Sequence, residues 1–89
     1  MRFVNVPVEP DTRIIQQREI VIGDIPSLYQ QWSWDGLIAE SISFYDQDVE
    51  DLSDDDLFDL ISDYAVPDEQ FTVSRSSSGY TFINFNFRH

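Results

Sequence analysis

The sequence predicts an α+β domain, in which an antiparallel sheet of four to five strands carries one amphipathic acidic helix (about 53–65) and one short helix near 26–32. Three observations predict it: β-rich segments toward both ends of the chain, one segment with helical spacing after the midpoint, and a Ser/Gly loop between two apolar runs at the C-terminus. With 89 residues, the chain supports one modest core, so we expect a single domain over 1–89.

Two strands are expected in the first quarter of the chain. Residues 3–8 alternate Val with other residues, and Pro7 suits an edge strand because it cannot donate a ladder hydrogen bond. Residues 13–22 are rich in β-branched side chains and end at a Gly-Asp pair. We expect the two strands to pair through a turn at 9–11.

The next two segments give weaker signals. Pro26 fits the first turn of a helix and good helix formers follow it, which predicts the short helix near 26–32. Residues 37–45 fit either a helix face or a strand, in which Ile38, Glu40, Ile42 and Phe44 alternate with small residues. The Ser and β-branched content favours a strand, followed by a polar connection over 46–51.

The acidic helix has clear start and stop signals. Ser53 is a good N-cap, Asp56 completes a capping-box-like pair with it, and Leu52 and Leu57 occupy the positions of a hydrophobic staple. Pro67 ends the helix. The predicted apolar stripe consists of Leu57, Leu60, Ile61 and Tyr64, widened by Phe58 and Ala65.

The last segment predicts a β-hairpin, with the four-residue loop SSSG between the apolar runs QFTVSR and YTFINFNF. Asn84 and Asn86 are expected to face outward. Tyr80 and Phe82 lie on the same side, so part of that outer side should be covered or should tend to bind other apolar surfaces. The residues expected to face the core are Thr81, Ile83, Phe85 and Phe87.

Charge is distributed unevenly along the chain. The net charge is −12, and the stretch from Glu19 to Ser74 holds fifteen acidic residues and no basic one, while all five Arg residues lie in the flanks. Such concentrated charge repels itself and opposes binding to nucleic acid or to an anionic membrane. We therefore expect no nucleic-acid or membrane partner, but a basic protein.

On the predicted helix, Asp55, Asp56, Asp59 and Asp63 gather opposite the apolar stripe. The pairs four residues apart carry like charges, each costing an isolated helix about 0.2–0.5 kcal/mol. They are separated by about 6 Å along the axis, a scale on which a row of carboxylates can stand in for nucleic-acid phosphates. An ordinary solvated face is an equally good explanation. The flanking acids that would extend the surface are Asp46, Asp48, Glu50 and Asp51, with Asp68 and Glu69 beyond the helix.

Catalytic, metal and cofactor sites are not expected. The chain has no Cys and no Lys, and its one His is the last residue. The segment DQDVEDLSDDDL begins like a calcium-binding EF-hand loop, but its sixth residue is Asp51 instead of Gly and its twelfth is Leu57 instead of Glu. Without Cys, signal peptide or apolar span, the expected location is the cytoplasm, or the host cytoplasm for a phage protein.

In size, acidity and lack of catalytic residues, the chain resembles the small phage or mobile-element inhibitors that block CRISPR effectors or restriction enzymes. This resemblance rests on gross properties and implies a non-enzymatic inhibitor that binds a positively charged nucleic-acid site on another protein. The alternatives are an antitoxin or immunity protein that caps a basic toxin, and an acidic housekeeping domain whose charge serves solubility. The sequence leaves the oligomeric state open.

Overall fold

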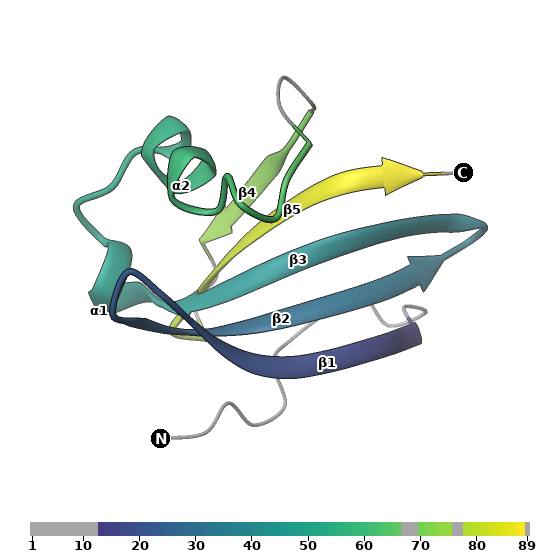
Figure 1. Cartoon of the computed structure of the whole chain (residues 1–89), viewed down its shortest axis with the longest axis horizontal. Coiled ribbons are helices and arrows are strands. Elements are labelled where there is room, and N and C mark those ends of the chain that lie inside the picture. The colour runs from purple at the N-terminus through teal and green to yellow at the C-terminus, as the bar shows by residue number, and fades with distance from the viewer. Residues whose placement is uncertain (1–12, 67–69, 76–77, 89) are drawn as a thin grey trace.

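The computed structural model describes residues 13–66, 70–75 and 78–88, which form one antiparallel five-stranded sheet and two short helices (Figure 1). This confirms the predicted α+β class. The predicted strand at 3–8 and its turn at 9–11 lie outside the described residues. The elements are β1 (Arg13–Ile22), β2 (Ile25–Trp34), β3 (Leu37–Tyr45), α1 (Asp46–Val49), α2 (Asp54–Leu60), β4 (Thr72–Arg75) and β5 (Tyr80–Arg88).

The sheet has the order β1-β2-β3-β5-β4, with every neighbouring pair antiparallel. Strands β1 to β3 form a meander, and the chain then passes through both helices before β4 and β5 complete the sheet. The pairing of β4 with β5 is consistent with the predicted C-terminal hairpin. The central strand β3 therefore has neighbours from both halves of the chain.

The prediction of a helix near 26–32 is wrong, because this segment is the middle of β2. Tyr29 lies opposite Arg18 of β1 and Ile42 of β3, so both edges of the strand are paired. Backbone pairing on two sides and burial of the consecutive residues 27–30, which face both sides of the sheet, outweigh the local helix propensity of Leu28 and Gln30. The prediction of a strand at 37–45 is confirmed by β3.

Both hairpin turns in the meander consist of two residues with positive φ. Gly23 and Asp24 have φ of 51° and 69°, and Asp35 and Gly36 have φ of 48° and 83°. This backbone matches the right-handed twist of paired strands, and Gly and Asp are among the residues that adopt it most readily. The two turns therefore fix the register of the first three strands.

The sheet has two faces with different surroundings. The inner face carries the main core, in which sheet residues such as Ile42, Phe44 and Ile83 pack with Leu57 of α2 and with Ile61 just after it. The outer face consists of the alternate residues of the same strands. Its buried members are Leu28, Gln30, Ala39, Ser41, Ser43 and Phe82.

Strand β5 departs from simple alternation near its end. Thr81, Ile83 and Phe85 are buried as predicted, but Asn86 has φ of 53° and is 5% exposed, so its predicted outward orientation is wrong. The pairing of β3 with β5 shifts register at this point, and the irregularity turns the Asn86 side chain inward. Phe87, predicted in the core, is half-buried and lines a groove with Leu37, Phe71 and neighbouring residues.

The acidic helix begins where predicted but is shorter. Ser53 caps α2, and the capping box with Asp56 is complete. The helix proper ends at Leu60, and hydrogen-bonded turns continue to Ala65, whereas the sequence predicted one helix over about 53–65. In the predicted connection at 46–51, four residues form the single turn α1. Neither of the helices within the described ranges has the length and apolar character needed to cross a bilayer.

Candidate interaction surface

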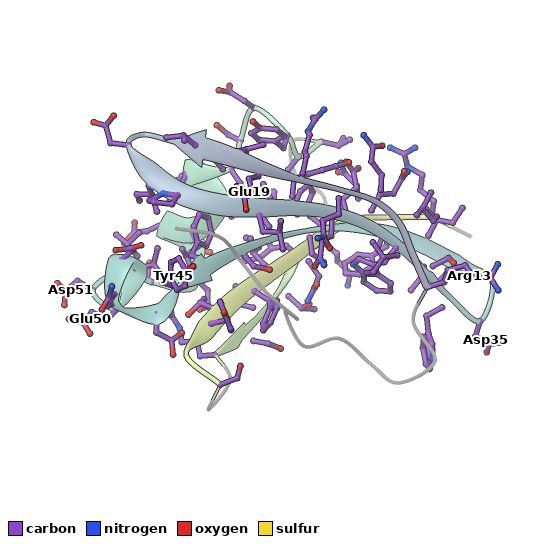
Figure 2. The ribbon with its side chains drawn as sticks, turned by 90° about the horizontal axis from the view of Figure 1, so that it is seen from below. Arg13, Glu19, Asp35, Tyr45, Glu50 and Asp51 are labelled. Atoms are coloured by element: carbon purple, nitrogen blue, oxygen red, sulfur yellow. The ribbon has the colours of Figure 1, made fainter. Side chains whose placement is uncertain are left out.

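Nine acidic residues lie between positions 46 and 63, on α1, on α2 and on the segments that follow each helix. Figure 2 shows Glu50 and Asp51 at one end of the molecule and Arg13 at the opposite end. We call the set the acidic end. It consists of Asp46, Asp48, Glu50, Asp51, Asp54, Asp55, Asp56, Asp59 and Asp63.

Buried apolar side chains anchor the acidic end to the sheet. Val49 of α1 is 1% exposed, and Leu57 and Ile61 have no exposed surface. Phe58 of α2 stacks on Phe71 with the ring centroids 4.4 Å apart. A surface carried by side chains buried this completely presents its carboxylates from fixed backbone positions.

Three of the carboxylates have partners within the protein. Asp46 accepts a hydrogen bond from the Thr81 hydroxyl. Asp56 accepts one from the backbone N–H of Ser53 at 3.2 Å, as the capping box requires. Asp54 lies 3.6 Å from the Arg75 guanidinium. These side chains already serve the fold, so Asp46 and Asp56 are weaker candidates for partner binding than the sequence predicted.

Arg75 is the basic residue of the described chain that contacts the acidic end. Its Nη2 donates to the carbonyl of Leu52 at 2.7 Å, and its Nη1 lies 3.5 Å from the carbonyl of Val49. The Arg75 side chain thereby joins the C-terminal end of α1 to the start of α2. The sequence does not predict this contact, because the position of Arg75 depends on the pairing of β4 with β5, in which Arg75 lies opposite Thr81.

The remaining six carboxylates are exposed, and no hydrogen bond or ion pair to them occurs among the described residues. They are Asp48, Glu50, Asp51, Asp55, Asp59 and Asp63. Asp55 and Asp59 lie four residues apart on α2, as predicted. Asp63 lies in the turns after Leu60, so only Asp55 and Asp59 of the three carboxylates predicted on one helix face lie on α2.

A second polar cluster surrounds Glu40 on the inner face of the sheet. The Tyr29 hydroxyl donates to Glu40, and the Asn86 amide donates to the second Glu40 oxygen at 2.6 Å. Arg88 lies 3.9 Å from that same oxygen. The Asn86 amide also bonds the backbone of Tyr64 and Val66, so the cluster ties the segment after α2 to the sheet.

This environment changes the acidity of Tyr29. Burial and the hydrogen bond to Glu40 raise the pKa of its phenol to about 12, against the opposing charge of Arg18, whose guanidinium lies 5.0 Å from the ring centroid. Sequence reasoning missed the cluster. The available signal was Glu40, which alternates with Ile42 and Phe44 on the face that becomes the core.

Within residues 13–66, 70–75 and 78–88, no three acidic side chains converge as ligands for a metal ion. The arrangement is therefore a charged surface on a fixed scaffold. Comparison with known proteins identifies no family for the chain, because no family model, no curated protein and no solved structure matches it.

Proposed function

We propose that this protein is a non-enzymatic inhibitor whose acidic end occupies the positively charged nucleic-acid site of another protein, such as a CRISPR effector or a nuclease. The observation that carries the proposal is the set of six exposed carboxylates without partners in the described structure. They lie on α1, on α2 and on the segments after these helices, whose apolar side chains are buried, and Figure 2 shows two of them, Glu50 and Asp51, at one end of the molecule. Asp55, Asp59 and Asp63 are its centre, and the acids of 48–51 extend it.

The physical cost of this arrangement supports a functional role. Asp55 and Asp59 repel each other at i,i+4 spacing, and Asp is a poor residue for a helix interior. Lys or Arg at either position would relieve the repulsion and preserve solubility. Duplex DNA presents one charge per about 1.7 Å of axis, so a protein that binds it offers the dense positive field that a carboxylate cluster complements.

The test starts from affinity capture with the full chain, followed by binding measurements on the captured protein. Changing Asp55, Asp59 and Asp63 together to Asn should leave the fold intact and weaken binding by at least tenfold. Binding by the unchanged chain should also weaken steeply with added salt, because salt screens attraction between surface charges. Unaltered affinity of the triple variant would refute the proposal.

A matched control is available at the opposite end of the molecule. Asp35→Asn removes one negative charge, as Asp59→Asn does, and Asn tolerates the positive φ of this turn position. We expect Asp35→Asn to bind like the unchanged chain. Equal losses for Asp35→Asn and Asp59→Asn would mean that net charge matters and the acidic end does not.

The two alternatives give different results in the same experiment. An antitoxin or immunity protein would capture one basic toxin and rescue cells that express it. An acidic solubility domain would capture no basic partner, and it would gain stability with salt without any effect on binding.

A further inference from the structure

Three of the four Arg residues in the described ranges lie on the inner face of the sheet. Arg18 lies opposite Tyr29, a residue of the main core, and its guanidinium lies 5.0 Å from the Tyr29 ring centroid. Arg88 lies 3.9 Å from the Glu40 carboxylate, which accepts a hydrogen bond from the Tyr29 hydroxyl. Both guanidinium groups therefore belong to the side of the sheet that carries the core.

A β-bulge brings Arg13 to the same face. Arg13 and Arg18 are five residues apart, so in a regular strand their side chains would point to opposite faces. The pairing of β1 with β2 shifts register between these two residues, and Arg13 lies opposite Ser33. Ser33 is four residues beyond Tyr29 in the regularly paired strand β2, so it shares the inner face with Tyr29.

We call Arg13, Arg18 and Arg88 the basic platform. All three are exposed, and α1 and α2 lie toward the other end of the sheet, at the β1–β2 turn (Figure 1). Arg13 and Arg88 lie at opposite ends of one row of paired residues through β2 and β3, so three strand spacings, about 14 Å, separate their backbones. Charges spread this widely fit the surface of another macromolecule better than a single small anion.

The basic platform is a positive region on an acidic protein. Glu40 lies beside it, and Asp35 lies at the same end of the molecule in the β2–β3 turn (Figure 2). Three positive charges are thus accompanied by two negative ones, whereas the whole chain has a net charge of −12. Glu40 already accepts hydrogen bonds from Tyr29 and Asn86. Arg13 and Arg18 form no ion pair among the described residues, so they can bind an external acidic surface.

We propose that the basic platform binds the acidic end of a second copy of this chain. The acidic end supplies the complementary charge, since six of its carboxylates are exposed and have no partner in the described structure. The two surfaces consist of different residues, so the contact is head-to-tail and leaves one surface of each kind available on every pair. Assemblies should therefore grow beyond dimers as the protein concentration rises. Only copies of this chain take part, so the test is independent of the proposed inhibitor function.

Added salt should act on this contact in two directions. At low salt, the net charge of −12 makes whole molecules repel one another. At about 0.15 M salt the Debye length is about 8 Å, so distant repulsion is screened while close guanidinium–carboxylate attraction persists; at about 1 M that attraction weakens too. Sedimentation velocity on the full chain should therefore show the largest assemblies at intermediate salt. Assembly that increases steadily up to about 1 M would overturn the proposal.

Two variants that each lose one surface test the head-to-tail geometry. The platform variant carries Arg13→Gln and Arg18→Gln, and the acidic-end variant carries Asn at positions 55, 59 and 63. Each alone should be monomeric at concentrations where the unchanged chain assembles. An equal mixture should form a one-to-one dimer and stop there, because each variant keeps the surface that the other lacks.

Several results would overturn the proposal. One is an unchanged chain that stays monomeric at every concentration and salt, and another is a mixture that stays monomeric while the unchanged chain assembles. Stronger assembly of the acidic-end variant, which is three charges less negative, would show that net repulsion alone controls association. If a variant fails to fold by circular dichroism, amide chemical shifts of the unchanged chain on dilution decide. They should change on both β1 and α2, and changes confined to one of them would contradict the contact.

Discussion

At the scale of single residues, two serines of β3 occupy similar positions on the outer face and differ in their hydrogen bonds. The Ser41 hydroxyl accepts from the Trp32 indole at 2.5 Å and donates to Asn84 at 2.6 Å. The Ser43 hydroxyl has no surface exposed to solvent and no partner in the described structure. A buried hydroxyl without a partner costs free energy, whereas one that links two side chains stabilises the fold.

This difference predicts opposite effects of the same substitution. Ser41→Ala should lower the free energy of unfolding by about 1–3 kcal/mol, because two hydrogen bonds to half-buried partners are lost and each contributes about 0.5–1.5 kcal/mol. Ser43→Ala should leave the free energy of unfolding unchanged or raise it. Chemical denaturation of both variants checks the prediction, and a loss of similar size at Ser43 would show that its hydroxyl has a partner.

Tyr29 makes stability depend on pH in the alkaline range. Its pKa of about 12 in the folded protein exceeds the ordinary value of 10.0, so the folded state binds the phenolic proton more tightly. The resulting stabilisation is fully present below pH 10 and is lost as the pH rises through 12. Because one pKa unit corresponds to about 1.4 kcal/mol, the loss is on the order of 2 kcal/mol.

The corresponding measurement is the free energy of unfolding from pH 8 to pH 12 for the unchanged chain and for Tyr29→Phe. Burial also raises the pKa of Tyr45, so the unchanged chain has more than one alkaline contribution and the difference between the two curves isolates Tyr29. We expect the curves to converge above pH 10. Parallel curves would contradict the shifted pKa.

At the scale of elements, α2 depends on its ends because its seven residues are too few for a stable isolated helix. The Ser53 hydroxyl accepts a hydrogen bond from the backbone N–H of Asp56 at 3.1 Å. Three Asp residues in the first turn also interact favourably with the positive end of the helix dipole. The last turn has no basic residue to complement the other end of the dipole. Packing of Leu57 and Ile61 in the core provides the rest of its stability.

Loss of the cap should therefore be measurable. We expect Ser53→Ala to lower the free energy of unfolding by about 1 kcal/mol, within the usual range of about 0.5–2 kcal/mol for a lost N-cap. Ser62→Ala is the matched control, since Ser62 is an exposed serine just after the helix. An equal effect at Ser62, or none at Ser53, would show that the capping box contributes nothing in solution.

Local signals predicted elements whose determinants are close in sequence. The capping box around Ser53 and the β-branched residues of β1 and β3 belong to this group. Strand β2 was missed because its conformation follows from its two neighbours in the sheet, β1 and β3. The inward turn of Asn86 was missed for a related reason, since a register shift between strands leaves no trace in the alternation of one strand.

At the scale of the whole molecule, carboxylates concentrate on the two helices and on the segments that follow them. The acidic end carries nine carboxylates, and among the described residues Arg75 forms an ion pair with one of them, Asp54. Arg13 lies at the opposite end of the molecule (Figure 2). The location of the acidic end was predictable, because it follows from one continuous stretch of sequence. The capping contact of Asp56 was also predicted, whereas the internal contacts of Asp46 and Asp54 were not, because their partners, Thr81 and Arg75, come from β5 and β4.

The central claim is that the acidic end occupies a nucleic-acid site, and competition for the partner tests it most directly. With the captured partner immobilised, its nucleic-acid ligand and this protein should exclude each other, and the variant with Asn at positions 55, 59 and 63 should fail to displace the nucleic acid. A ternary complex containing the partner, its nucleic acid and the unchanged chain would contradict the claim.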